Sequence, residues 1–190
     1  LELVSLSAEQ LKVVDAVVKG TSVLMHGPAG TGKSVVLKRL IHIYNSRSMT
    51  IALTAPTGSA AVNIGGCTIH SFFKGCGLMK DTPAKLVRKL KRNPIAYNNI
   101  KHMRLFVIDE ISMVSSKFLD KIEQVFKLVR GNDLVFGGVQ VLFSGDFYQL
   151  PPIEKDVDGS QFAFESKCWK GLKLKTVEMT KVFRQVDDSF

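Results

Sequence analysis

Cysteine is scarce in this sequence, and its spacing supports neither of its usual structural roles. Cys67, Cys76 and Cys168 are the three cysteines among 190 residues. Their odd number and the lack of a C-x-x-C spacing argue against a disulfide framework and against a zinc site. We therefore expect reduced thiols in a reducing compartment.

Long apolar runs are missing as well. The longest, such as Leu105–Ile108, are too short to span a bilayer, and no signal peptide follows Leu1. We interpret the chain as a piece of a larger intracellular protein without a membrane partner, in the nucleus or mitochondrion if eukaryotic and in the cytoplasm otherwise. Its 190 residues, 45% of them hydrophobic, suffice for one globular domain with a sizeable core.

Acidic residues are outnumbered by basic ones. The chain has 26 Lys and Arg against 17 Asp and Glu, a formal net charge of +9. A basic surface attracts polyanions, so nucleic acid is a natural partner, although the charge could also serve only solubility. The amphipathic segment 83–92 leaves the same choice open: Lys85, Lys89 and Arg92 on one face suit either a solvated helix or a track along DNA.

Short apolar segments alternate with amphipathic ones along the chain. Their periodicity predicts strands at residues 23–25, 51–54, 105–108 and 139–143, and helices after Ser7, at 33–44 and at 116–129. This order predicts an α/β fold with a mainly parallel sheet and helices on both faces. Ligands of such sheets bind beyond the carboxyl ends of the strands, where the polar clusters of this chain fall. We expect surface loops at 74–82 and 153–161.

A glycine-rich turn follows the first predicted strand. Its residues fit the pattern G-x-x-x-x-G-K-[ST] in full: Gly27, Pro28, Ala29, Gly30, Thr31, Gly32, Lys33 and Ser34. Such glycines let backbone N–H groups and a helix N-terminus face a phosphate. Lys33 would reach the β- and γ-phosphates of ATP, and the Ser34 hydroxyl would bind Mg²⁺. The flanking strand and helix favour a P-loop over a chance turn.

Further candidate catalytic residues follow two later strands. Asp109 comes directly after the strand at 105–108 and could order the shell of a magnesium ion, while Glu110 could polarise the attacking water. The alternative to a catalytic role is an acidic pair that is merely solvated at the end of the strand. The presence of a complete P-loop favours the catalytic role. Gln149, after the last strand, could bond to the γ-phosphate or the attacking water from the side opposite Lys33.

Two short segments are candidates for DNA binding. Pro56, Thr57 and Gly58 follow the second strand and could form an anion site for a nucleic-acid backbone, although tight helix–sheet packing explains them equally well. His70 could meet a phosphate and Phe72 could stack on a base. A lone histidine and neighbouring phenylalanines are more often core residues, which favours the structural interpretation of this second segment.

In this order and spacing, the motifs resemble those of the PIF-type (petite integration frequency) DNA helicases of superfamily one, subfamily B. Besides the P-loop and the acidic pair, the resemblance rests on residues 6–10 (Q motif), 53–73 (motif Ia), 118–140 (signature segment), 145–152 (motif III) and 180–185 (motif IV). It covers essentially the whole chain. It implies a RecA-like P-loop NTPase domain in which Gln10 reads the adenine and Arg184 acts as an arginine finger.

The resemblance also implies an ATP- and Mg²⁺-dependent 5′-to-3′ helicase acting on single-stranded DNA in repair, recombination or telomere maintenance. Residues 1–190 would form the first motor domain, with a small wedge-like loop insertion somewhere in about 64–82. The second RecA-like domain is absent from the chain, and we expect a monomer. The alternatives are a RecD- or relaxase-type motor domain and a non-catalytic nucleotide-switch or DNA-binding module. The acidic pair and Gln149 count against the non-catalytic module.

Overall fold

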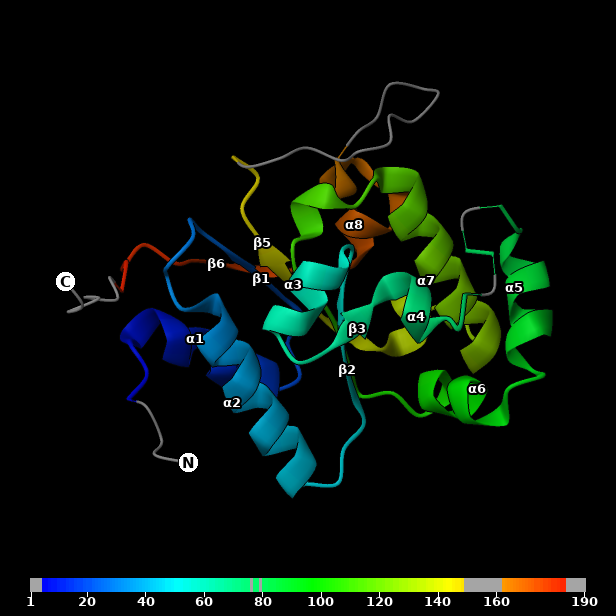
Figure 1. Cartoon of the computed structure of the whole chain (residues 1–190), viewed down its shortest axis with the longest axis horizontal. Coiled ribbons are helices and arrows are strands. Elements are labelled where there is room, and N and C mark those ends of the chain that lie inside the picture. Colours follow the sequence, from blue (N-terminus) through cyan, green and yellow to red (C-terminus); the bar gives the residue numbers. More distant parts are fainter. Residues whose placement is uncertain (1–4, 76, 79, 149–161, 184–190) are drawn as a thin grey trace.

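A six-stranded sheet forms the centre of the computed structural model, which describes residues 5–75, 77–78, 80–148 and 162–183 (Figure 1). The strands are β1 (Val23–His26), β2 (Ile51–Ala55), β3 (Cys67–Thr68), β4 (Leu105–Ile108), β5 (Gln140–Gly145) and β6 (Lys175–Glu178). They pair in the order β3-β2-β4-β5-β1-β6, and every pair is parallel. The predicted α/β fold with a parallel sheet is confirmed.

Helices and 3-10 turns connect the strands. They are α1 (Ala8–Val18), α2 (Lys33–Ser46), α3 (Gly58–Asn63), α4 (Ile69–Phe72), α5 (Pro83–Leu90), α6 (Pro94–Lys101), α7 (Ser116–Arg130), α8 (Lys167–Gly171), η1 (Ile111–Met113), η2 (Val135–Gly138) and η3 (Ala163–Glu165). A capping box starts α1, because Ser7 and Gln10 exchange both of its hydrogen bonds. None of the helices in the part of the chain that the structure describes is long and apolar enough to cross a membrane.

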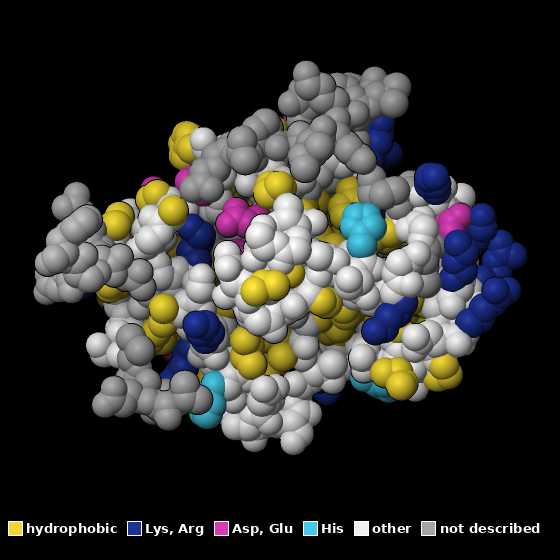
Figure 2. All heavy atoms as spheres, in the orientation of Figure 1, with side chains coloured by type: hydrophobic (Ala, Val, Ile, Leu, Met, Phe, Trp, Pro, Cys, Tyr) yellow, Lys and Arg dark blue, Asp and Glu magenta, His cyan; other side chains and the backbone are white. Residues whose placement is uncertain are grey.

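The sheet is buried on both faces, as β4 illustrates. Leu105 and Val107 belong to the core formed with α1, α2 and α3, whereas Phe106 and Ile108 belong to the core formed with α4 to α8. A strand covered on both sides has no polar face, which is why its sequence reads as a continuous apolar run. Figure 1 shows α1 and α2 towards one end of the molecule and α5 and α6 towards the other. Lys and Arg side chains gather at the α5 end of the molecular surface that Figure 2 shows.

Two edge strands were not predicted from the sequence. β3 has two residues, and β6 exposes three of its four side chains, so neither shows an apolar run. β6 pairs with β1, the strand that leads into the P-loop, with His26 opposite Glu178. The residues after Glu178 therefore lie beside the P-loop, although more than 140 positions separate the two segments in the sequence.

The signature segment forms hydrogen bonds with the connection between β3 and β4, at the end of α6. Arg130, at the end of α7, donates from Nε to the carbonyl oxygen of Gly137 at 2.6 Å and from Nη1 to carbonyl oxygens at the C-terminus of α6, that of Lys101 among them. Gly137 has φ +59°, and a Cβ atom there would lie 2.8 Å from the carbonyl oxygen of Phe126. Both the left-handed backbone and this close approach require glycine.

Candidate nucleotide and DNA site

The P-loop leaves the sheet at the carboxyl end of β1, between β5 and β6. The Gly27 N–H donates to the carbonyl oxygen of Gly145 on β5 at 3.2 Å. Gly30 and Gly32 both have φ +79°, in the left-handed region that glycine adopts without strain. Gly32 is also the N-cap of α2 and brings no side-chain cap, so the first N–H groups of this helix remain available to a phosphate.

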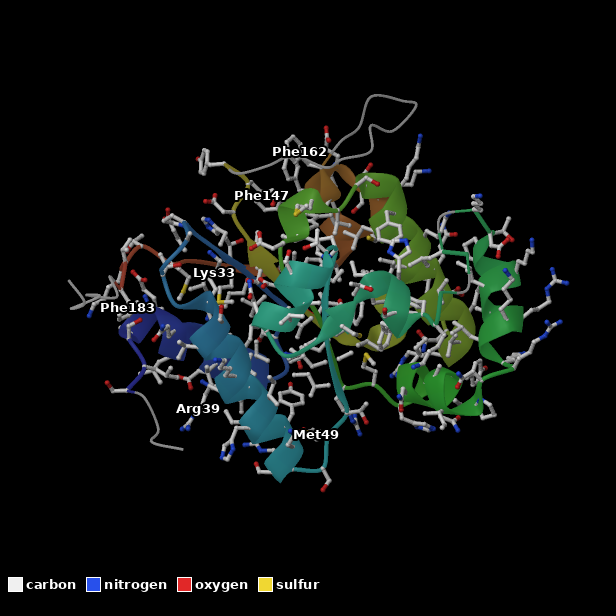
Figure 3. The ribbon with its side chains drawn as sticks, in the orientation of Figure 1. Lys33, Arg39, Met49, Phe147, Phe162 and Phe183 are labelled. Atoms are coloured by element: carbon white, nitrogen blue, oxygen red, sulfur yellow. The ribbon has the colours of Figure 1, made fainter. Side chains whose placement is uncertain are left out.

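Lys33 begins α2 and reaches back over the loop. Its Nζ atom donates to the carbonyl oxygens of Gly27 at 2.6 Å and Pro28 at 2.9 Å. The Thr31 hydroxyl donates to the same Pro28 oxygen at 2.9 Å, which fixes the turn. Figure 3 shows Lys33 at the carboxyl edge of the sheet, and the exposed Ser34 follows it on the helix. An ammonium group and a hydroxyl therefore stand side by side at the mouth of the loop.

Asp109 emerges from β4 into the same edge of the sheet. Its N–H donates to the Thr54 carbonyl oxygen at 2.8 Å, and its side chain is buried. Burial raises the pKa of this carboxyl, while the Ser144 hydroxyl, the Glu110 backbone N–H and the positive charge of Lys33 oppose the rise. The buried Ser144 Oγ itself stands outside hydrogen-bonding geometry with every group in the described residues. The structure thus brings together the P-loop lysine and the acidic pair.

Glu110 has a strained backbone. Its φ of +53° and ψ of +45° place a non-glycine residue in the left-handed region, a conformation that clusters at functional sites. Burial raises the pKa of its carboxyl; the negative charges of Asp109 and Asp146 add to the rise, and Lys33 opposes it. A carboxylate that holds a proton more readily than usual suits the handling of an attacking water.

Gln10 lies behind the P-loop. It is 3% exposed, its Nε2 donates to the Gly32 carbonyl oxygen at 3.3 Å, and its Oε1 accepts from the Ser7 N–H at 2.8 Å. A Cβ atom on Gly32 would come within 2.3 Å of that Nε2. Gln10 therefore joins α1 to the loop, and its recognition of adenine stays a prediction.

The segment at 180–183 is a contact that the sequence analysis missed. Its first two residues, Thr180 and Lys181, donate backbone N–H groups to the Glu9 carboxylate at 2.9 and 3.3 Å, and the Thr180 hydroxyl donates as well. The Phe183 N–H donates to the Gly30 carbonyl oxygen at 2.8 Å, and its ring, 42% exposed, lies over Gly32. Figure 3 shows Phe183 beside α1. The pairing of β6 with β1 would have revealed this contact, but an exposed strand gives no apolar signal.

Asp146 is a second residue that the predicted catalytic set left out. It is 8% exposed at the end of β5, and its Oδ1 accepts from the Tyr148 N–H at 3.0 Å. Its charge reaches Glu110, whose pKa it raises. Gln149 and Arg184, predicted as γ-phosphate sensor and arginine finger, lie outside the described residues.

The candidate DNA-binding turn follows β2. Because β2 and β4 are parallel neighbours, with Thr54 opposite Ile108, Pro56, Thr57 and Gly58 lie at the same edge as the acidic pair. The Thr57 Oγ1 accepts from the Ala60 N–H at 3.3 Å and caps α3, while Gly58 is exposed. The turn therefore lies next to the nucleotide site, and its contact with DNA stays a prediction.

His70 and Phe72 differ in their surroundings. His70, on α4, is exposed and stacks on Phe118 of α7 with ring centroids 5.6 Å apart. Phe72 is half-buried and packs on Phe73 and Phe106 at 5.0 and 5.5 Å. His70 presents a polar side chain to solvent, whereas much of the Phe72 ring contributes to the core; DNA contact by either stays a prediction.

The fold and these residues define a RecA-like P-loop NTPase domain. The chain belongs to the PIF1-like helicase family, whose sequence profile matches residues 5–190. The predicted family is thereby confirmed, and it accounts for the signature segment as well as for the P-loop.

Relatives of known function show the same similarity. The chain is 44% identical over 192 residues to the ATP-dependent DNA helicase RRM3 of Saccharomyces cerevisiae, covering 97% of this chain and 26% of that protein. It is 44% identical over 185 residues to the human ATP-dependent DNA helicase PIF1, covering 97% and 28%. The chain therefore spans little more than a quarter of the length of these relatives.

Solved structures agree with the sequence comparison. The Pif1 helicase of Candida albicans superposes with a TM-score of 0.87 at 43% identity, over 96% of this chain and 41% of that one. A Bacteroides Pif1 helicase in complex with ADP-AlF3 and single-stranded DNA superposes with a TM-score of 0.79 at 32% identity, over 97% and 44%.

Proposed function

We propose that this chain is the ATP-binding motor domain of an ATP-dependent 5′-to-3′ helicase acting on single-stranded DNA in repair, recombination or telomere maintenance. The observation that carries the proposal is the meeting of Lys33, Asp109 and Glu110 at one edge of the sheet, beside the turn that starts α3. The names of the relatives, and the nucleotide analogue and single strand in the Bacteroides complex, support it.

The loop fits the phosphates of a nucleotide. A Cβ atom on Gly27 would lie 2.2 Å from the Met179 carbonyl oxygen, so backbone alone can follow this path. Ser34 and Asp109 offer the oxygen ligands that Mg²⁺ prefers. An ion held by these two residues would offset the negative charge of the phosphates. Lys33 would exchange its carbonyl partners for phosphate oxygens, as a P-loop lysine does.

Hydrolysis requires groups that position water and offset charge on the transferring phosphate. Glu110, with its raised pKa, would orient the water; by resemblance, Gln149 would contact the γ-phosphate and Arg184 would act as a finger. The left-handed backbone of Glu110 costs about 1–3 kcal/mol. A passive DNA-binding module gains nothing from such strain, which favours the enzyme over that alternative.

The parent enzyme would work with two motor domains. We propose that a second RecA-like domain closes on the nucleotide held by this one, and that a small wedge lies within about 64–82. We also propose that the enzyme is a monomer. Its single-stranded DNA would be contacted by Pro56, Thr57, Gly58 and His70. We further propose that it acts in the nucleus or mitochondrion if the source is eukaryotic, and in the cytoplasm otherwise.

The decisive experiment compares ATP hydrolysis by this chain and by a chain extended through the downstream domain, each with and without single-stranded DNA. We expect the short chain to bind nucleotide and hydrolyse it poorly, because an arginine finger needs the closed site and is worth about 10³–10⁵ in rate in P-loop GTPases. The longer chain should show DNA-dependent turnover that Arg184→Ala removes. Brisk, DNA-stimulated hydrolysis by the 190-residue chain would contradict the two-domain site.

A further inference from the structure

The positive charge of the chain is concentrated in one region. Residues 74–108 contain nine Lys and Arg and one acidic residue, Asp81, so this stretch carries +8 of the total +9. The rest of the chain is therefore close to neutral. The stretch comprises α5, α6, the turns around them and β4; its basic residues all precede β4, and none of them belongs to the nucleotide site.

Four exposed charges of this stretch lie on α5 and the turn after it. Lys85, Arg88, Lys91 and Arg92 are exposed, and we call these four residues the basic surface. The opposite face of α5 is buried in the core. Figure 2 shows dark-blue side chains grouped at the edge of the molecule where Figure 1 places α5.

Of the four residues of the basic surface, Lys85 pairs with a nearby carboxylate in the part of the chain that the structure describes, and Arg88, Lys91 and Arg92 do not. Asp81 is 8% exposed and pairs with Lys85 and Lys89, which lowers its pKa. On α7, which packs against α5, Glu123 pairs with Lys127 at 2.8 Å and Asp120 accepts two backbone N–H groups of α8. Residues 82–108 contain no acidic side chain. Like charges on neighbouring turns of a helix destabilise it, so such a cluster has a cost that a ligand would repay.

The chemistry of the surface favours phosphate over bases. Proteins that hold single strands combine basic grooves with exposed aromatic rings on which bases stack. Between residues 82 and 104 the one Phe, Tyr or Trp residue is Tyr97, which is half-buried and donates its hydroxyl to the Val129 carbonyl oxygen at 3.4 Å. The surface thus offers charge without a stacking platform. An eight-residue helix is about 12 Å long, a length over which a DNA duplex carries about seven charges.

We propose that the basic surface binds the phosphate backbone of double-stranded DNA, at a place separate from the nucleotide site and from the candidate single-strand contacts. α5 lies at the end of the molecule opposite α1, which backs the P-loop (Figure 1). α7 links the two DNA regions, since its Phe118 stacks on His70 and the same helix packs against α5. A duplex held there would lie on the same layer of helices as α4, which carries the candidate single-strand residue His70.

The test measures binding of this chain to a labelled 20-base-pair duplex and to one of its single strands, by fluorescence anisotropy between 50 and 200 mM KCl. The surface variant carries Arg88→Gln, Lys91→Gln and Arg92→Gln, which leaves the lysines paired with Asp81 in place. The control variant carries Lys19→Gln, Lys170→Gln and Lys175→Gln, three exposed lysines elsewhere, for the same change of charge. Urea unfolding and ADP binding of each variant verify the fold and the nucleotide site.

For the duplex, we expect the surface variant to bind at least tenfold more weakly at 100 mM salt, with the slope of log K against log salt reduced by about 2–3. The control variant should keep the wild-type slope, and single-strand affinity should change little. An equal loss in both variants would show a general charge effect and overturn the proposal. An equal loss for duplex and single strand, or stronger binding of the wild type to anionic phospholipid vesicles than to the duplex, would also overturn it. ADP binding tests the ATPase assignment independently, because none of the altered residues lies at the P-loop.

Discussion

The Glu9 carboxylate accepts two backbone N–H groups, from Thr180 and Lys181, and one hydroxyl from a segment 171 residues later in the chain. The hydrogen bonds from Thr180, first that of its side chain, lower the pKa of Glu9. A lowered carboxyl pKa means that the ionised form is favoured in the folded state. This stabilisation is present above the usual value of 4.5 and is lost as pH falls through the lowered pKa.

Glu9→Ala should release the segment at 180–183 from α1. We expect faster hydrogen exchange at the Thr180 and Phe183 amides and weaker ADP binding, because Phe183 then loses its place over the P-loop. Asp15→Ala, an exposed acidic residue of the same helix, is the matched control and should change neither quantity. Wild-type exchange at Phe183 in the Glu9 variant would show that the Gly30 hydrogen bond alone holds the segment.

Lys33→Ala should weaken nucleotide binding strongly while leaving the fold intact. Charged hydrogen bonds are worth about 1.5–3 kcal/mol, so ADP affinity should fall by about 10- to 100-fold. Isothermal titration measures the loss, and Lys38→Ala, an exposed lysine further along α2, serves as control. Equal affinities of the Lys33 variant and the wild type would remove the loop from the nucleotide site.

Asp109→Asn should stabilise the nucleotide-free protein and weaken the binding of magnesium and nucleotide. Burial raises the pKa of Asp109, so the ionised carboxyl costs stability above that raised pKa. The cost disappears as pH falls below the ordinary value of 3.8. The gap in melting temperature between variant and wild type should therefore shrink from pH 7 towards pH 4. Asp15→Asn should show no gap at any pH, and a constant gap for Asp109→Asn would contradict the burial argument.

Gly137→Ala should destabilise the protein by about 2–4 kcal/mol. The left-handed backbone contributes about 1–2 kcal/mol and the contact with the Phe126 carbonyl oxygen the remainder. Gly131 has a similar φ of +65° with nothing within 4 Å of its added Cβ. Gly131→Ala thus measures the backbone part alone by urea unfolding. Equal losses in the two variants would mean that the loop of Gly137 relaxes around the methyl group.

Local sequence patterns predicted much of this structure. The full P-loop pattern and the strand before Asp109 placed the nucleotide site, since parallel strands bring their carboxyl ends to one edge. Pairings between distant exposed residues, such as Glu9 with Thr180, leave no periodic trace in a sequence. The edge strand β6 went unpredicted for the same reason, and Phe183 with it. The strain at Glu110 is equally invisible, because it arises from tertiary packing and overrides local preference.

The uneven charge described for α5 and its surroundings makes the protein an electric dipole as well as a cation. Electrostatic potentials fall off over a Debye length of about 10 Å at 0.1 M salt. The charged end of the protein therefore attracts an approaching polyanion more strongly than the rest of the protein does. The molecule would then turn towards DNA with α5 leading, which raises the rate of productive encounters at low salt. Reversing the charges on α5 should slow association with a duplex at low salt, and the difference from the wild-type rate should shrink as salt screens the charges.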